Sequence, residues 1–430
     1  MREFGIGLLG LGTVGSGVLK GLQENGEVLA ERLGAKLVVR KIADIDLSKA
    51  KNLNIDPAIM TTDAYSVIND PKIDIIVELI GGMGPAKEFI LKSLKLKKPV
   101  ITANKALLAN NGSEIFETAC ANNTDICFGA SVGGGIPIIR VLREGLIANK
   151  VESMYGIVNG TCNYILTKMG QDGMTFEAAL KEAQAKGYAE TNPSFDIDGI
   201  DSQHKTTLLS SLAFGLYFPV KDVSVSGIRD VTERDMRFAS ELGYTIKLLA
   251  VIKSGKEVEA RVHPTLIPKT SPLAAVNGVF NAIMVNGDMT GRSIYYGRGA
   301  GQMPTAATVL ADVCEVVRNI MAKSPLRMKP IPGAHNDLKI KPVESIETRY
   351  YLRLSLMDRP NVMATVTSIF GKHGISLASV LQKELKAGKY VTVLIITHTA
   401  KEKNIQTALE EINSLDVVGS KSVMFRIEDI

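Results

Sequence analysis

Residues Phe4–Gly15, FGIGLLGLGTVG, decide the fold of the amino-terminal part of the chain. A short apolar run, Phe4–Gly10, is typical of a strand, and apolar residues with helical spacing follow from Val18 to Val28. Between them stands the pattern G-x-G-x-x-G, whose glycines allow a tight turn and let backbone N–H groups approach a pyrophosphate at the positive end of the helix. The stretch therefore predicts a dinucleotide site formed by Gly10, Gly12, Thr13, Val14 and Gly15.

The second predicted strand, Lys36–Ala43, is followed by an acidic residue, Asp44. A carboxylate at this position can accept hydrogen bonds from both ribose hydroxyls of NAD and repels the 2′-phosphate of NADP. Arg40 argues for NADP, although the alternation of side chains along a strand need not direct it to the ribose. The pattern favours NAD over NADP. The alternative for Asp44 is an ordinary turn residue.

Strand-like runs at Ile73–Ile80, Pro99–Ala103 and Asp125–Ser131 alternate with helical stretches around Ala86–Leu96 and Ser113–Ala121. This alternation predicts an α/β domain with a parallel, doubly wound sheet. Ligands of such sheets bind at the carboxyl ends of the strands, and Lys105 follows one of them. We expect Lys105 to reach cofactor or substrate; the alternative is a solvated lysine at the start of a helix.

The composition bounds the function classes. The chain has 430 residues, 45% of them hydrophobic and 22% charged, with a net charge of +5 and no block of like charges. We therefore expect no nucleic-acid partner and no membrane partner. The amino terminus lacks the pattern of a signal peptide, and no apolar run has membrane-spanning length. Four scattered cysteines indicate free thiols in a reducing compartment, and we expect a cytoplasmic protein.

Two stretches of the middle section carry candidate chemistry. A strand at Val151–Val158 leads into a helix through small polar residues, so Gly160 and Thr161 could bind a substrate carboxylate through helix N–H groups. Thr161 as a simple helix N-cap is the alternative. The second stretch, Gly187–Lys205, begins as a loop and becomes helical from Asp198. Asp201 and Lys205 lie four residues apart on one helix face, which an isolated surface ion pair would also explain.

The strands predicted next, Ile246–Ile252 and Lys256–Ile267, alternate apolar and polar residues and form an antiparallel pair. Asn281–Val285 and Ser293–Tyr296 extend the same sheet, whose open face we expect to form a dimer contact. A helix over Thr305–Ala322 follows Gly301. A proline-rich linker at 323–348 comes next, with His335 expected to be solvated.

The carboxyl-terminal segment predicts a small separate domain. Its order of elements is βαββαβ, which is ferredoxin-like. Leu352, Leu354 and Leu356 mark the first strand, and a hairpin is expected around Ala387-Gly388.

Five segments, taken together, resemble homoserine dehydrogenases in collinear order over residues 1–320. They are GLGTVG, TANKALLA around Lys105, SVGGGIP, GIVNGTCNYIL and GYAETNPSFDIDGIDSQHK. The segment DRPNVMATVTSIFGKHGISLASVLQK resembles an ACT domain, a regulatory module that binds amino acids.

The resemblance implies a fold and a set of domains. It pairs a Rossmann NAD(P)-binding domain, 1–131 completed by about 298–322, with an α+β catalytic and dimerisation domain, 132–297. The linker 323–348 and an ACT domain, 349–430, follow. It also implies a homodimer or homotetramer and a place in threonine, methionine and isoleucine biosynthesis.

The resemblance further implies the reaction, which interconverts L-homoserine and L-aspartate 4-semialdehyde with NAD or NADP. Lys205 would be the general acid/base beside Asp201, while Lys105 polarises the reacting oxygen or relays the proton. The substrate-binding set implied is Glu190 for the ammonium group, with Asp196, Asp201, Gly160 and Thr161. Gly187, Gly301 and Lys105 join the cofactor site.

Two departures from the family stand out. Gly129 occupies the position of a glutamate that helps hold a sodium ion, which leaves only the carbonyls of Val132, Gly134 and Ile136 for a monovalent cation. In the ACT segment, Asn361 stands where the family usually has glycine. Inhibition by threonine is the expectation for this domain, with a role in oligomer assembly as the alternative. A catalytically silent amino-acid sensor on a dehydrogenase scaffold is the alternative for the whole chain.

Overall fold

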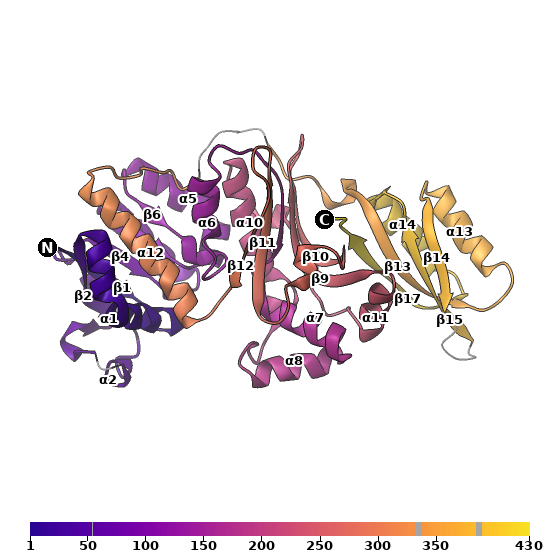
Figure 1. Cartoon of the computed structure of the whole chain (residues 1–430), viewed down its shortest axis with the longest axis horizontal. Coiled ribbons are helices and arrows are strands. Elements are labelled where there is room, and N and C mark those ends of the chain that lie inside the picture. The colour runs from indigo at the N-terminus through magenta and orange to yellow at the C-terminus, as the bar shows by residue number, and fades with distance from the viewer. Residues whose placement is uncertain (54, 332–337, 384–388) are drawn as a thin grey trace.

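The structure is a computed structural model that describes residues 1–53, 55–331, 338–383 and 389–430. The chain forms three sections in a row, with the amino-terminal α/β section at one end and the carboxyl-terminal section at the other (Figure 1). The predicted hairpin turn at Ala387-Gly388 and the predicted solvated His335 lie outside the described residues. No helix of the described residues is long and apolar enough to cross a membrane.

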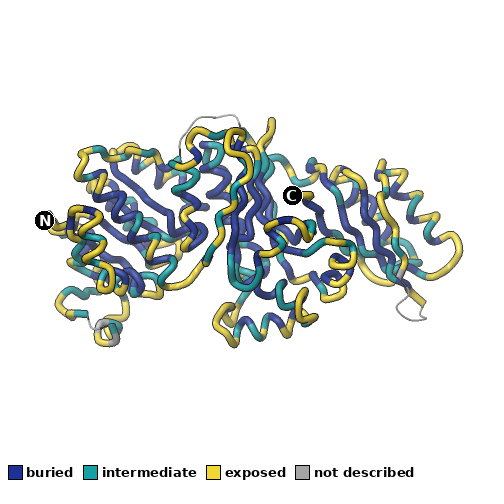
Figure 2. The backbone as a smooth tube through the Cα atoms, in the orientation of Figure 1, coloured by how far each residue is buried: buried dark blue, intermediate teal, exposed yellow. Residues whose placement is uncertain are grey.

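The first section is built on a six-stranded parallel sheet with the order β3-β2-β1-β4-β5-β6. Its strands are β1 (Arg2–Leu9), β2 (Ala35–Ala43), β3 (Met60–Thr61), β4 (Ile75–Glu78), β5 (Val100–Thr102) and β6 (Ile126–Cys127). β1 and β4 are almost completely buried, as expected when helices cover both faces of a parallel sheet (Figure 2). The doubly wound parallel sheet predicted from the sequence is confirmed.

The predicted strand Asp125–Ser131 is too long. Residues Gly129–Ser131 form a 3₁₀ turn, because the N–H of Gly129 donates to the carboxylate of Asp312 (2.8 Å) instead of to a strand neighbour. Further along the chain, α6 (Ile138–Arg140) passes directly into a π-helical turn at Val141–Gly145.

The helices of this section include one from much later in the chain. α12 (Gln302–Met321) packs along α1, and close contact is possible because Gly17 and Gly21 of α1 carry no side chain. A Cβ on Gly17 would lie 2.8 Å from the carbonyl oxygen of Gln302. The other helices are α1 (Thr13–Leu33), α2 (Lys49–Asn52), α3 (Ala64–Ile68), α4 (Gly84–Lys95) and α5 (Lys105–Ala121).

The middle section is a mixed sheet with helices packed on it. Its strands run in the order β12-β11-β7-β9-β10, and α7, α10 and α11 pack on β9. The strands are β7 (Val151–Ile157), β8 (Ser224–Val225), β9 (Tyr244–Lys253), β10 (Glu259–Pro268), β11 (Phe280–Gly287) and β12 (Gly291–Arg298). The helices are α7 (Gly160–Asp172), α8 (Phe176–Ala185), α9 (Ser194–Ile197), α10 (Ile200–Phe214) and α11 (Glu233–Glu241).

The carboxyl-terminal section has the predicted βαββαβ order, with its own apolar core. Its elements are β13 (Glu347–Met357), α13 (Val362–Lys372), β14 (Leu377–Lys383), β15 (Tyr390–Thr397), β16 (Ala400–Lys401), α14 (Glu402–Asn413) and β17 (Val418–Ile427). Its sheet is continuous with the middle sheet, because β17 pairs in parallel with β10 at Thr265↔Arg426 and Leu266↔Ile427. The two sheets together form one sheet of eleven strands, in which β8 pairs with β10 and β16 with β13 outside the main strand order. The sequence did not predict this continuity.

Candidate active site

The glycine-rich turn between β1 and α1 has the geometry of a phosphate site. Gly10 has a φ of 95°, and a Cβ on Gly15 would lie 2.3 Å from the carbonyl oxygen of Gly10, so both positions require glycine. A Cβ on Gly12, in contrast, would have no neighbour within 4 Å. The backbone of Gly12 therefore faces open space at the positive end of α1, whose first residues are Thr13 and Val14.

A cavity of about 540 Å³ opens beside this turn, lined by Gly10, Gly12, Asp44 and Lys49 among others. Asp44 accepts hydrogen bonds from the N–H of Leu11 (2.6 Å) and from the ammonium group of Lys49 (2.9 Å). Burial alone raises the pKa of Asp44, but its backbone hydrogen bonds and Lys49 bring the pKa below its usual value. Asp44 also accepts from the N–H of Asp46 (2.9 Å), so it forms a turn at the end of β2 and lines the cavity at the same time.

Two basic residues near this cavity differ in their placement. Arg40 forms an ion pair with Glu3 (2.6 Å) and does not line the cavity. Lys49 does line it, and the sequence analysis missed this residue. The available signal was a lysine five positions after the acidic residue at the end of the second strand.

The densest group of charges lies at the start of α10, which begins after Gly199 (φ 84°). Lys205 donates to the carboxylate of Asp201 and to the carbonyl oxygen of Val158, both at 2.7 Å. Lys105, at the start of α5, approaches the other carboxylate oxygen of Asp201 at 3.2 Å. The structure thus brings two lysines from different sections of the chain onto one buried carboxylate.

Asp201 is held as an anion by this arrangement. Burial alone raises the pKa of Asp201, but the ammonium groups of Lys205 and Lys105 outweigh burial and hold the pKa well below its usual range. The pair Asp201–Lys205 is not a surface ion pair, because both side chains are buried.

Asn159 organises the rest of this group. Its amide nitrogen donates to Asp196 and to Asp201, each at 2.8 Å, and its amide oxygen accepts from the N–H of Cys162. Asn159 is therefore the N-cap of α7, and the alternative interpretation of Thr161 as N-cap is wrong. The hydroxyl of Thr161 donates instead to the carbonyl oxygen of Tyr188 (2.6 Å). Burial raises the pKa of Asp196.

These residues surround a cavity of about 380 Å³ between the first and middle sections. Its lining contains Lys105, Asn159, Gly160, Thr161, Gly187, Tyr188, Asp196, Asp201, Lys205, Val279, Arg298, Gly299, Ala300 and Gly301. Glu190 is exposed and does not line this cavity. Asn159 and Arg298 were not recognised from the sequence, because neither belongs to a charged cluster along the chain.

Lys105 is placed by a buried network under the loop at Gly81-Gly82. The buried carboxylate of Glu78 accepts hydrogen bonds from the hydroxyl of Thr102 (2.7 Å) and from the N–H groups of Ile80 and Gly81. Asn104 caps α5 and donates to the carbonyl oxygen of Gly82 (2.6 Å). This network fixes the start of α5 and hence the base of the Lys105 side chain.

His204, the neighbour of Lys205 in sequence, forms no ion pair with Asp201 within the described residues. Its ring packs edge-on against Phe195 with centroids 5.5 Å apart, and burial lowers its pKa. Nδ1 of His204 has no hydrogen-bond partner in the described part of the chain. This packing agrees with a structural role for His204.

Two of the carbonyls expected to hold a monovalent cation near Gly129 also accept hydrogen bonds within the protein. The carbonyl oxygen of Gly134 accepts a hydrogen bond from Thr308 (2.6 Å), and that of Ile136 accepts from the N–H of Ile138 (2.8 Å). A side chain at Gly129 would meet the carboxylate of Asp312 at 2.9 Å. Two of the three carbonyls named for a monovalent cation are thus already bound within the protein, and the position of the missing glutamate is taken by Asp312.

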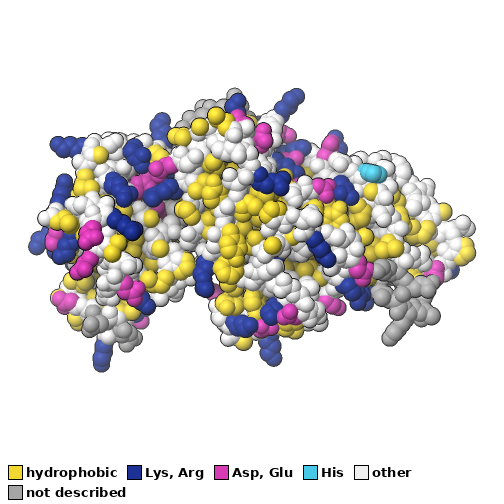
Figure 3. Space-filling view, viewed as in Figure 1, with side chains coloured by type: hydrophobic (Ala, Val, Ile, Leu, Met, Phe, Trp, Pro, Cys, Tyr) yellow, Lys and Arg dark blue, Asp and Glu magenta, His cyan; other side chains and the backbone are white. Residues whose placement is uncertain are grey.

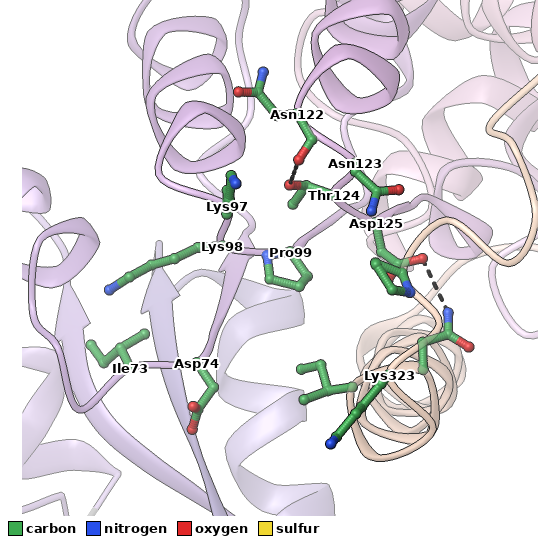
Figure 4. A pocket seen from close by; sticks show the side chains of 13 residues that line it. Ile73, Asp74, Lys97, Lys98, Pro99, Asn122, Asn123, Thr124, Asp125 and Lys323 are labelled. Atoms are coloured by element: carbon green, nitrogen blue, oxygen red, sulfur yellow. Dashed lines mark hydrogen bonds between the residues drawn. The ribbon is translucent and has the colours of Figure 1, made fainter.

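A further cavity, of about 520 Å³, lies at the opposite edge of the first sheet (Figure 4). Asp74, Pro99 and Asp125 line it, and each precedes a strand, so this cavity is at the amino ends of β4, β5 and β6. Ligands of doubly wound sheets bind at the carboxyl ends. The cavity in Figure 4 is therefore not part of the catalytic site.

The fold and this site define a class of protein: a nicotinamide-dependent oxidoreductase with a carboxyl-terminal regulatory domain. Comparison with known proteins agrees. The homoserine dehydrogenase NAD-binding domain matches residues 10–129, the homoserine dehydrogenase domain 137–314, and the ACT domain 350–417. The chain belongs to the homoserine dehydrogenase family.

Relatives and solved structures extend over most or all of the chain. A homoserine dehydrogenase of Neisseria gonorrhoeae is 42% identical over 434 residues, covering 100% of both chains. The crystal structure of a homoserine dehydrogenase from Thiobacillus denitrificans is 44% identical with a TM-score of 0.94, covering 100% of this chain and 99% of that one. A hyperthermophilic archaeal homoserine dehydrogenase mutant in complex with NADPH is 28% identical with a TM-score of 0.64 and covers 76% of this chain and all of its own.

Proposed function

We propose that the cavity around Asp201 interconverts L-homoserine and L-aspartate 4-semialdehyde. The observation that carries the proposal is the convergence of Lys205 and Lys105 on one buried carboxylate beside a nucleotide-binding section. In the reduction direction, Lys205 donates a proton to the aldehyde oxygen as that oxygen gains negative charge. Lys105 stabilises the same charge. A bound nicotinamide supplies the hydride to the aldehyde carbon, and the reverse direction returns both.

The remaining residues of the site fit the ends of an amino-acid substrate. Asp196 offers an anionic oxygen to the substrate ammonium group, and Gly160 and Thr161 begin α7, where N–H groups are free to bind an anion. Glu190 lies on the exposed loop before α9, so its assignment to the ammonium group requires that this loop move toward the cavity.

A matched pair of lysine variants tests the proton-transfer role. With L-homoserine and NAD or NADP, we expect Lys205→Ala to lower kcat by at least about a hundredfold, the usual scale for a general acid or base. Lys181 lies on the exposed side of α8, so Lys181→Ala should leave kcat unchanged. Activity retained in Lys205→Ala would move the proton-transfer role to Lys105. No reduction of either cofactor by folded wild-type protein would favour the silent amino-acid sensor instead.

For the cofactor, the proposal favours NAD over NADP. The carboxylate of Asp44 is ionised and lines the cavity beside the glycine turn, which suits ribose hydroxyls and opposes a 2′-phosphate. Lys49 is the counter-argument, because its ammonium group lines the same cavity. The proposal keeps the carbonyls of Val132, Gly134 and Ile136 as ligands of a monovalent cation, because a carbonyl oxygen that accepts one hydrogen bond has a second lone pair.

For regulation, we favour threonine as the ligand of the ACT domain. Asn361 begins α13 in the left-handed region (φ 69°), a conformation that asparagine tolerates almost as glycine does. The substitution of asparagine for the usual glycine therefore preserves the backbone path. Inhibition of turnover by L-threonine but not by L-leucine would support this role. This regulation fits the threonine, methionine and isoleucine branch of biosynthesis.

The middle sheet offers a surface for a homodimer or, with further contacts, a homotetramer. Figure 3 shows hydrophobic side chains gathered over the middle section, and Ile294 and Tyr296 of the edge strand β12 are among the exposed hydrophobic residues. A monomeric mass measured by light scattering at micromolar concentration would contradict this assembly. All four cysteines are free and three are buried, in agreement with the cytoplasmic location that we propose.

A further inference from the structure

The cationic side chains that line the catalytic cavity differ in their partners. Lys205 and Lys105 both bind the carboxylate of Asp201. The guanidinium group of Arg298 forms no hydrogen bond or ion pair within the described residues. The guanidinium carbon of Arg298 lies 6.0 Å from the centroid of the Phe280 ring. Arg298 is thus a cation at the cavity whose hydrogen-bond donors remain available.

The backbone around Arg298 is held firmly at the rim of the cavity. Arg298 ends β12 opposite Phe280, and its carbonyl oxygen accepts from the N–H of Gly135 (3.0 Å). The next residue, Gly299, packs on the side chain of Asn281 so closely that a Cβ there would lie 2.1 Å from the amide carbon. The backbone of Arg298 is therefore fixed at the rim, and its exposed side chain lines the cavity together with Val279.

The substrate proposed above carries a carboxylate, an ammonium group and a reacting oxygen. The two lysines are assigned to the reacting oxygen and to Asp201, and Asp196 supplies the anion for the ammonium group. The substrate carboxylate then has the N–H groups of α7 but no cation of its own. A guanidinium group binds a carboxylate through two parallel hydrogen bonds, which a lysine cannot do.

We propose that Arg298 binds the α-carboxylate of the substrate and so determines selectivity for an amino acid over the corresponding amino alcohol. The inference rests on the proposed function of the cavity. It adds a residue that belongs to none of the segments on which the family resemblance was based.

The competing ligand for Arg298 is a phosphate of the cofactor, since Gly299–Gly301 lie at the same rim. The two ligands share anionic oxygens but are carried by different molecules. KM is therefore measured for the substrate with the cofactor saturating, and for the cofactor with the substrate saturating. The KM that changes in an Arg298 variant identifies the molecule that Arg298 binds.

The test compares Arg298→Gln and Arg298→Lys with Arg292→Gln, an exposed arginine on the same strand. L-Homoserine is compared with 3-aminopropan-1-ol, which has the same hydroxyl and ammonium groups but no carboxylate. Where turnover of the amino alcohol is too slow to follow, its inhibition constant against L-homoserine replaces KM.

We expect Arg298→Gln to lower kcat/KM for L-homoserine by about 10- to 100-fold, the scale of a lost charged hydrogen bond, mainly through KM. In Arg298→Gln, the KM or inhibition constant of 3-aminopropan-1-ol and the KM of the cofactor should stay unchanged. Arg298→Lys should recover part of the lost kcat/KM for L-homoserine. Arg292→Gln should have the kinetic constants of wild type. Equal losses for both compounds, or a raised KM for the cofactor instead, would overturn the inference. Failure of the proposed function is a separate outcome: wild-type protein would then turn over no L-homoserine with either cofactor.

Discussion

Replacement of Asp312 by asparagine should change how the stability of the protein depends on pH. Asp312 lies on α12 with its carboxylate against the N–H of Gly129, and it is almost completely buried. Burial raises the pKa of Asp312 and outweighs the hydrogen bond from Gly129 and the charge of Arg140, which both lower it. The resulting pKa is about 7. Asparagine has nearly the same shape and keeps an oxygen that can accept from Gly129, but it does not titrate.

The sign and size of the effect follow from the two pKa values of Asp312. Between pH 3.8 and about 7 the folded carboxyl group holds a proton that the unfolded chain has lost, so the stability of wild type falls as pH rises through this window. The difference between the two values corresponds to about 4 kcal/mol, of which about 3 kcal/mol falls between pH 5 and pH 8. Asp312→Asn should lack this loss and become the more stable protein at pH 8.

Urea unfolding followed by far-ultraviolet circular dichroism at pH 5, 6, 7 and 8 measures the difference directly. The exposed carboxylate Asp222 offers a control, because Asp222→Asn should follow wild type at every pH. If the free-energy difference between Asp312→Asn and wild type is the same at pH 5 and pH 8, Asp312 does not titrate in this range and the reasoning from burial is refuted.

Three further substitutions test other parts of the structure. Asp44→Ala should raise KM for NAD by about tenfold and that for NADP less, because the ribose hydroxyls lose an acceptor; an unchanged ratio of the two constants would contradict the NAD preference. The free energy of unfolding of Lys247→Met should fall relative to that of wild type by up to about 3 kcal/mol as pH rises from 8 to 10.5. Burial lowers the pKa of Lys247 to about 8, so in this window the unfolded lysine holds a proton that the folded one has lost, and wild type gains stability; a difference independent of pH would exclude this. Asn159→Ala should lower kcat/KM at least about tenfold, since Asp196 and Asp201 both lose their shared donor; kinetics like those of wild type would show that this bridge is dispensable.

The sequence was most informative where local spacing determines geometry. The glycines from Gly10 to Gly15 indicated a phosphate turn, and the spacing of four between Asp201 and Lys205 placed both side chains on one face of α10. The approach of Lys105 to the same carboxylate was expected only by resemblance, because it depends on how two sections pack.

Contacts between distant segments account for what the sequence did not predict. Asn159 and Arg298 reach the cavity through the ends of β7 and β12, and neither stands in a charged cluster that would mark it. In the same way, Gly129 leaves the predicted strand because Asp312, 183 residues later, binds its N–H group. Such pairings depend on sheet order and helix packing, which local periodicity does not determine.

The pairing of β17 with β10 limits how the chain can be divided. Arg261 of β10 is fully buried and forms an ion pair with Glu428, just beyond β17 (2.5 Å). A fragment that ended before β13 would leave β10 unpaired at Thr265 and Leu266 and would remove one carboxylate partner of a buried guanidinium group. Removal of the regulatory domain should therefore lower the stability of the remaining part of the chain. Relief of the inhibition by threonine proposed above is better sought by point substitutions around Asn361, which leave this junction intact.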